Sequence, residues 1–502
     1  MRESARAGDE VAVDHTGSMP AAGATAGGSG REAAQPPVGG LAIVLHSHMP
    51  YVEGFGTYPF GEEWLFDAIA RSYLPVLEVA DRVTMTVTPV LADQLEAPGV
   101  AARLREFVER YRAGACEADA AEVGGDLAPA CLAEAARYCR GLDQLAELGD
   151  DLTAIFRQPL AAGRIELMAS AATHAVLPLV ATRGGRRLQI DAGLRSHRRR
   201  FGRPAGLWLP ECAYEPGLDR LLAERGVRFF CVDQSAHEPP AAALAPVRSP
   251  AGPVAFPIAW DAISLLWSSD GYPSHPGYAD FHRQSLRGAH PWSIGGGAYD
   301  PTAAEAVARR HAGELVDAVA ARLERFRDRH RRPGLVTFAV DTELLGHWWW
   351  EGPAWLEELL RLAPARGVEP LTLSAALERH DPETRPLRRS SWGEGKELRT
   401  WDSPQVADLA WGARRLELRL LRSLGAGRLA PAAAARATRE LLAVQASDWA
   451  FLDRRRQAGD YPFQRVTAHS AALLEALHAG EPPAPGLRNL APDLSLAPLL
   501  EP

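Results

Sequence analysis

Two acidic residues stand at the ends of strand-like apolar runs, and each has tryptophan nearby. Glu211 lies in the segment WLPECAY, and Asp341 lies in LVTFAVDTELLGHWWWEG. A pair of carboxyl groups can break a glycosidic bond, because one attacks the anomeric carbon while the other protonates the leaving oxygen. A single acid at a strand end more often caps a helix or pairs with an arginine. Two acids in matching surroundings favour the catalytic interpretation.

Tryptophans gather near both acids and on later loops. A flat ring suits the apolar C–H face of a sugar, whereas an isolated tryptophan is usually a core residue. The consecutive residues Trp348–Trp350 cannot all face a core from one short loop, so we expect at least one to line a cleft or an interdomain surface. The tryptophans near the motifs or on loops are Trp208, Trp267, Trp348, Trp349, Trp350, Trp392 and Trp401.

His46 and His48 form an H-x-H pair after the first predicted strand. In some metal hydrolases such a pair supplies two ligands, and His174 with Asp341 could complete a site of an amidohydrolase or deacetylase. Neutral imidazoles can also hydrogen-bond sugar hydroxyls without a metal, and a lone histidine is usually a structural group. The residues alone leave these alternatives open.

Strand-like and helical segments alternate along the part of the chain that must position these residues. This alternation favours a parallel sheet covered by helices. Polar residues follow the strand-like runs repeatedly, as at the mouth of a (β/α) barrel. An open doubly wound sheet is the alternative, but no glycine-rich phosphate loop follows the first strand. The strand-like runs lie at about 41–45, 84–89, 163–179, 206–214, 227–233, 253–258 and 335–341.

Composition divides the chain into four parts. We expect a Gly- and Ala-rich disordered leader, a catalytic barrel with a helical insertion, a helical C-terminal domain that contributes to the substrate cleft, and a loosely structured Pro-rich tail. These parts cover residues 1–39, 40–385 (with the insertion at about 98–160), 386–480 and 481–502.

Charge and cysteine content exclude several classes of protein. The net charge is -8 over 502 residues, without a basic stripe for nucleic acid. The five cysteines include no CxxC pair, so a disulfide framework or a thiolate zinc site is not expected, and a reducing cytoplasm fits best. No apolar run is long enough to span a bilayer.

Five segments resemble, in order, the sequence motifs of glycoside hydrolase family 57. They are LHSHMPYV, GRIELMASAATHAVLPL, WLPECAY, FAVDTELLGHWWWEG and TLSAALERH. Three further segments, WSSDGYPSHPGYADFHR, SSWGEGKELRTWD and QASDWAFL, are similar to the 1,4-α-glucan branching enzymes of that family. The resemblance covers residues of about 40 to 470, and five ordered motifs are far more specific than any single one.

The resemblance implies an α/β fold, an incomplete (β/α)7 barrel with a helical insertion and an all-helical C-terminal domain. It implies a retaining transferase that makes α-1,6 branches in a glycogen-type α-glucan, with no metal and no other cofactor. Glu211 would be the nucleophile and Asp341 the general acid and base. The matching substrate-binding residues would be His46, His48, His174, Trp267, Trp392 and Trp401. Further candidates in or beside the same motifs are Trp208, Asp233, His347, Trp349 and Trp449.

One loop departs from the family pattern. Branching enzymes of the family carry a tyrosine in the loop after the fourth strand, where it is thought to shield the intermediate from water. The corresponding segment here, residues 237–252, is short and has no tyrosine. An α-amylase or a 4-α-glucanotransferase on the same site is therefore the alternative. A non-catalytic glucan-binding protein is a further one, although the presence of both Glu211 and Asp341 argues against it.

Overall fold

The structure is a computed structural model that describes residues 37–54, 56, 60–239, 243–427, 429–479 and 489–501. Most of the expected leader at 1–39, and residues 481–488 of the expected tail, lie outside the described residues.

Seven parallel strands close into a barrel in the order β1, β2, β3, β4, β5, β7, β8 and back to β1, which confirms the predicted fold class. The barrel is weakly paired at two places, because a single residue pair joins β4 to β5 and another joins β7 to β8. β9 adds to the edge of β1, and β6 runs antiparallel to β7. The strands are β1 Gly39–Ser47, β2 Val83–Val87, β3 Ile165–Ser170, β4 Leu207–Trp208, β5 Phe229–Asp233, β6 Val247–Arg248, β7 Val254–Ile258, β8 Gly334–Asp341 and β9 Val368–Leu371.

Strand β1 is buried over its whole length, as its continuous apolar run predicts. It pairs with β8 in a register that sets His46 opposite Asp341. On its other side it pairs with β2, and His46 lies opposite Thr86. The first strand therefore brings an imidazole beside the last barrel acid.

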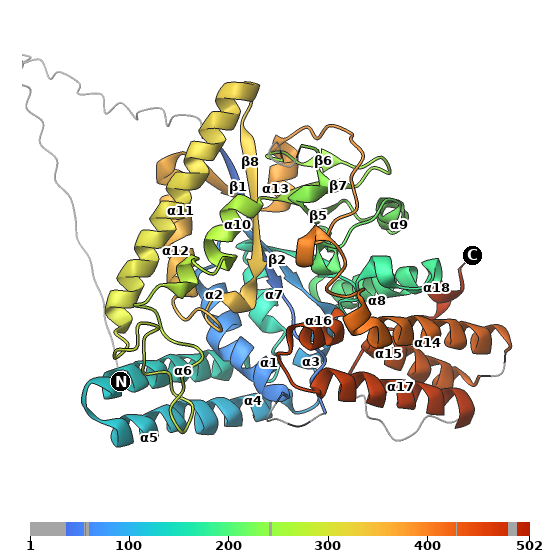
Figure 1. The fold of residues 1–502 in the computed structure, drawn as a ribbon, viewed down its shortest axis with the longest axis horizontal. Helices are drawn as coiled ribbons and strands as arrows, with labels where there is room; N and C mark the ends of the chain where they lie inside the picture. The colour runs from blue at the N-terminus through green and yellow to red at the C-terminus, as the bar shows by residue number, and fades with distance from the viewer. Residues whose placement is uncertain are drawn as a thin grey trace, which may run out of the picture. The chain divides into compact units, whose positions relative to one another are not determined.

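Helices cover the strands, and an inserted group of helices follows β2 (Figure 1). The carboxyl end of β8 points toward the side of the molecule where the insertion and the C-terminal helices lie. The helices that cover the barrel are α1 Glu62–Ala68, α2 Leu74–Val79, α3 Pro89–Leu95, α8 Arg183–Phe201, α9 Leu218–Glu224, α10 Trp260–Trp267, α11 Pro301–His330, α12 Gly352–Leu362 and α13 Leu373–Arg379. The inserted helices are α4 Val100–Val108, α5 Gly114–Val123, α6 Ala128–Leu148 and α7 Ala154–Ala161.

The C-terminal helices share a hydrophobic core with loops of the barrel. Val176 and Ala213, which follow β3 and β4, pack in one cluster with Trp401, Trp449 and Tyr461. The segments that carry the predicted site therefore rest directly on this helical group. Its helices are α14 Ala407–Gly425, α15 Pro431–Val444, α16 Ser447–Arg455 and α17 Tyr461–Ala479.

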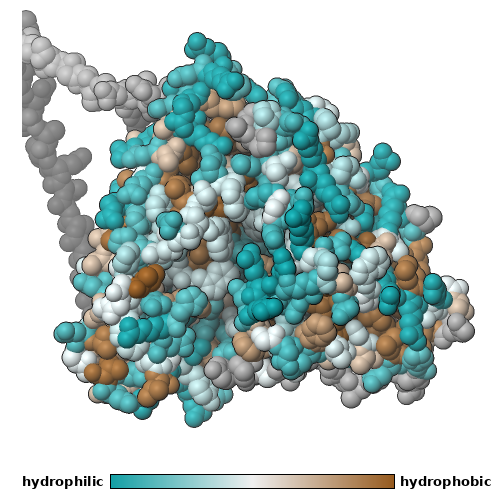
Figure 2. Space-filling view, viewed as in Figure 1, coloured by the Kyte–Doolittle hydropathy of each residue, from teal (hydrophilic) through white to brown (hydrophobic). Residues whose placement is uncertain are grey.

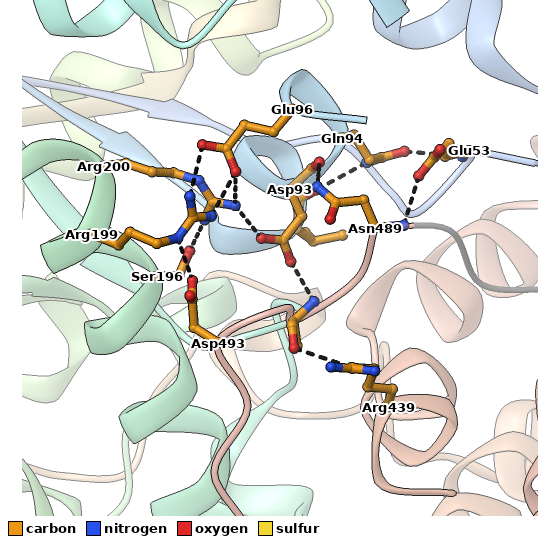
Figure 3. A network of polar contacts seen from close by, with 12 residues as sticks. Glu53, Asp93, Gln94, Glu96, Ser196, Arg199, Arg200, Arg439, Asn489 and Asp493 are labelled. Carbon is orange, nitrogen blue, oxygen red and sulfur yellow. Dashed lines mark hydrogen bonds and ion pairs between the residues drawn. The ribbon is translucent and has the colours of Figure 1, made fainter. Parts of the chain in front are cut away.

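The last described segment, residues 489–501, is packed where a loose tail was expected (Figure 3). Its Asn489 backbone N–H donates to Glu53 at 3.2 Å, and its Ala491 backbone N–H donates to Asp93 at 2.7 Å. The Asp93 carboxylate also pairs with Arg200, and both side chains are 1% exposed. We call residues 489–501 the strap. Its apolar residues and short helix α18, Ala497–Leu500, bury against α8, which the proline content of the region did not reveal.

None of the described helices has the length and apolar character to cross a bilayer. On the face shown in Figure 2, hydrophobic residues form small groups among hydrophilic ones. The exposed large hydrophobic side chains include three tryptophans, Trp267, Trp348 and Trp411.

Candidate active site

Glu211 lies in a short turn after β4 and has a left-handed backbone conformation. Its φ is 59°, and that of Cys212 is 48°. Residues other than glycine adopt this region rarely, and such strain is concentrated at functional sites. The backbone N–H of Trp392 donates to the Glu211 carbonyl oxygen at 3.1 Å and fixes the turn.

Two donors from distant segments hold the Glu211 carboxyl group. The Trp392 indole N–H donates to Oε2 at 3.0 Å, and the Ser447 hydroxyl donates to Oε1 at 2.9 Å. Burial raises the pKa of Glu211 to about 7, although these two hydrogen bonds oppose the rise. The side chain still keeps 15% of its exposure, so an external group can reach it.

A directed chain of hydrogen bonds runs from β2 to this carboxylate. Burial, and then neighbouring imidazoles, hold the pKa of His46 and of His174 well below the usual value, so both rings are neutral. An ionised carboxylate only accepts, so Ser447 donates to Glu211 and accepts from His174 Nδ1 at 2.9 Å. His174 Nε2 then accepts from His46 Nε2 at 3.0 Å, and His46 Nδ1 accepts from Thr86 at 2.6 Å. The chain fixes both tautomers behind Glu211.

His48 differs from the other two histidines because its pKa is raised and theirs are lowered. Burial alone would lower its pKa, but Asp448 at 2.9 Å, with Glu343 and Glu211 nearby, outweighs burial and raises the pKa. Its ring stacks on His174 with 4.1 Å between centroids. The side chain is 13% exposed, so His48 is the histidine of the three that can contact a bound group.

The surroundings of Asp341 favour its protonated form. Burial, then the charges of Glu343 and Glu211, raise its pKa well above the usual value. Glu343 accepts hydrogen bonds from the Tyr73 hydroxyl and from the His48 backbone N–H, and burial raises its pKa to about 7. The charge of an ionised Glu211 thus favours the protonated form of Asp341, as the separate roles of nucleophile and acid require.

The arrangement that a metal hydrolase would need is not formed by these histidines. All six ring nitrogens of His46, His48 and His174 are engaged in hydrogen bonds, those of His48 with Thr88 and Asp448. In the part of the chain that the structure describes, no three His, Cys, Asp or Glu side chains are arranged to hold a metal ion.

The predicted tryptophans occupy different environments. Trp208 is fully buried and stacks on His46 at 4.7 Å, and half-buried Trp392 meets its edge at 5.1 Å. Trp267 and Trp348 are exposed and lie 6.3 Å apart between ring centroids. Three predicted site tryptophans lie in the core at 1–3% exposure, so in this conformation they present no face to a ligand: Trp349, Trp401 and Trp449.

Two other predicted site residues lie apart from the carboxyl groups. Asp233 is 1% exposed and pairs with Lys396 at 2.8 Å, which ties the loop before α14 to the end of β5. His347 contacts Phe281 and Trp348, and burial together with Arg71 lowers its pKa to about 3.

Four residues of the site had no role assigned from the sequence: Tyr73, Glu343, Ser447 and Asp448. Glu343 stands two residues after Asp341 in the sequence DTE at the end of β8. This spacing of two acids was the sequence signal that could have identified Glu343 as a site residue. Ser447 and Asp448 begin α16 and meet Glu211 and His48 over separations of 236 and 400 residues. Such contacts leave no periodic pattern in the sequence.

Comparison with known proteins agrees with this geometry. Residues 42–266 match the model of glycosyl hydrolase family 57, and residues 415–491 match that of the 1,4-alpha-glucan branching enzyme C-terminal region. A probable 1,4-alpha-glucan branching enzyme of Mycobacterium tuberculosis is 34% identical over 495 residues, covering 88% of this chain and 93% of the relative. One from Thermococcus kodakarensis is 33% identical, covering 86% and 72%.

Solved structures give the same result. The GH57-type branching enzyme of Pyrococcus horikoshii superimposes with a TM-score of 0.85 at 29% identity, over 92% of this chain and 97% of that one. A GH57 branching enzyme of Thermococcus kodakaraensis superimposes with a TM-score of 0.86 at 30% identity, over 92% and 97%. The barrel, its sequence motifs and these relatives together show that the chain belongs to glycosyl hydrolase family 57.

Proposed function

We propose that the chain is a retaining 1,4-α-glucan branching enzyme. It would cleave an α-1,4 bond and transfer the released segment to a 6-hydroxyl of a glucan chain. The observation that carries the proposal is the contact of α16 with residues at the barrel mouth. Ser447 hydrogen-bonds Glu211, and Asp448 hydrogen-bonds His48. The region that resembles the C-terminal part of branching enzymes thus supplies groups to the site.

In the first half of the reaction, Glu211 attacks the anomeric carbon as a carboxylate and forms a covalent glycosyl-enzyme. Asp341 gives its proton to the departing 4-oxygen. Burial, then the charges of Glu343 and Glu211, raise the pKa of Asp341, so an ionised Glu211 favours a protonated Asp341, which agrees with this assignment. The raised pKa of His48 favours its protonated form, which would offset the carboxylates around it.

In the second half, ionised Asp341 takes the proton of the acceptor 6-hydroxyl. The 6-oxygen attacks the anomeric carbon and Glu211 departs, so two displacements retain the α configuration. Ser447 and Trp392 keep the Glu211 oxygens oriented during both steps, since each donates to one of them.

The test is incubation with amylose, with new α-1,6 linkages counted against new reducing ends. We expect linkages well in excess of free ends. Glu211→Gln should reduce turnover by roughly 10³-fold or more, and Asp341→Asn by roughly 10²–10⁴-fold. Glu378→Gln, on the exposed end of α13, is the matched control and should keep full activity. Near-normal activity in either site variant contradicts the assignment of roles.

An α-amylase or a 4-α-glucanotransferase is the second candidate. The loop at residues 237–252 favours it, because this segment is short and has no tyrosine to shield a covalent intermediate. Residues 240–242 of the loop lie outside the described residues. Reducing ends without branches would favour hydrolysis, and new α-1,4 chain lengths without branches would favour disproportionation.

A glycogen-type polysaccharide in the cytoplasm is the polymer that we propose as substrate. All five cysteines are free thiols, which supports a reducing compartment.

A further inference from the structure

Three consecutive tryptophans after β8 take three different directions. Trp349 enters the core at 1% exposure. Trp350 lies beneath the guanidinium groups of Arg137 and Arg71, at 3.9 and 5.0 Å from its ring centroid. Trp348 remains 42% exposed. An exposed indole offers a flat apolar face that a ligand can cover.

The loop that carries Trp348 is rigid. The Trp348 backbone N–H donates to the Glu343 carbonyl oxygen at 3.2 Å. The Gly346 backbone N–H donates to the Trp349 carbonyl oxygen at 2.7 Å. Gly346 has a φ of 100°, and a Cβ there would come within 2.1 Å of the Arg71 carbonyl oxygen. The backbone position of Trp348 is thus fixed, as expected of a preorganised binding residue.

Trp348 is the centre of a row of rings at the edge of the barrel mouth. The centroid of Trp267, at the end of α10, lies 6.3 Å away. On the other side His347 lies 6.0 Å from Trp348, and Phe281 lies 5.5 Å from His347. We call Trp267, Trp348, His347 and Phe281 the aromatic rim. Trp267 and His347 were expected to bind substrate, whereas Trp348 and Phe281 had no such assignment.

The rim lies on loops that adjoin both the carboxyl end of β8 and the helical insertion. The Trp348 backbone N–H donates to the Glu343 carbonyl oxygen, and the Glu343 carboxyl group accepts from the His48 backbone N–H. Phe281 lies under Arg71 and stacks with His290, whose ring bonds Glu134 of the helical insertion. The rim therefore extends from the loop that follows β8 and Asp341 toward the insertion.

We propose that the aromatic rim binds an α-glucan chain outside the sugar at which cleavage occurs, with Trp348 as its central contact. This inference rests on the proposed function. Successive sugar rings present apolar C–H faces that the exposed indoles can cover, and the polar groups of each sugar stay in water. The rim gives the enzyme a preference for long chains over short ones.

The test measures binding of maltoheptaose and maltotriose by calorimetry in the full chain carrying Glu211→Gln, which prevents turnover. Adding Trp348→Ala should weaken maltoheptaose binding roughly tenfold, and maltotriose binding less than twofold. Trp348→Phe should retain most of the affinity. Trp411→Ala is the matched control, because Trp411 is 54% exposed on α14 and is not part of the rim.

Each outcome decides a different point. Equal maltoheptaose affinity with and without Trp348 overturns the rim, while branching by the wild-type enzyme leaves the proposed function intact. A change of oligomeric state in Trp348→Ala, seen by light scattering at unchanged affinity, also overturns it and identifies a second copy as the occupant. Absence of both branching and glucan binding overturns the rim and the proposed function together.

Discussion

Ser447 connects the helical region to the proposed nucleophile through one hydroxyl. It donates to Glu211 Oε1 at 2.9 Å and accepts from His174 at 2.9 Å. Ser447→Ala removes a hydrogen bond to a charged group, which contributes about 1.5–3 kcal/mol. Since 1.36 kcal/mol corresponds to one pKa unit, the pKa of Glu211 should rise from about 7 by roughly 1–2.

The sign of this change predicts a specific pH profile. The acidic limb of kcat/KM follows ionisation of Glu211, so the limb moves to higher pH in Ser447→Ala. At pH 6 the variant should be slower by roughly 10–150-fold, which is the same free energy expressed as a rate. The deficit should shrink as the pH rises through the new pKa, because Glu211 is then ionised in both proteins.

The assay is branching activity on amylose measured from pH 5 to 9, with thermal unfolding followed in parallel. Ser447→Thr keeps the hydroxyl and should restore the position of the acidic limb. A deficit of equal size at every pH would refute the reasoning, because it would mean that the hydroxyl acts by shaping the site and not through ionisation of Glu211.

Two other changes test neighbouring groups. Tyr73→Phe removes a hydrogen bond that lowers the pKa of Glu343, so Glu343 should be protonated to a greater extent. A protonated Glu343 repels the Asp341 carboxylate less, so the pKa of Asp341 should fall. The alkaline limb of kcat/KM should then move to lower pH. An unmoved alkaline limb would exclude this coupling. Asp93→Ala leaves Arg200 buried with one partner fewer and should lower the free energy of unfolding by about 3 kcal/mol in urea titration. Unchanged stability would show that Glu96 alone satisfies Arg200.

The barrel was predictable because its strands are short apolar runs followed by polar residues. Even β4, with two residues, was found, since Glu211 and its neighbours form a motif. Local sequence patterns were thus sufficient to predict elements that depend on neighbouring residues.

The environments of the tryptophans were not predictable in the same way. Trp348 and Trp349 are neighbours in the sequence, but one is 42% exposed and the other 1%. Their loop is neither helix nor strand, so no period tells which ring faces the core. Likewise, the bond of Ser447 to Glu211 depends on how the C-terminal helices dock, which no local spacing encodes.

The strap joins residues that lie far apart in the sequence, and this has a consequence for synthesis. Asn489 bonds Glu53 across 436 residues. A ribosome that adds 5–20 residues per second needs roughly 20–90 s to cover that separation. The loop after β1 must therefore wait this long for its final partner, and the Asp93–Arg200 pair stays open to water meanwhile. Each new molecule thus passes through a nascent stage in which the barrel can form but its last contacts cannot.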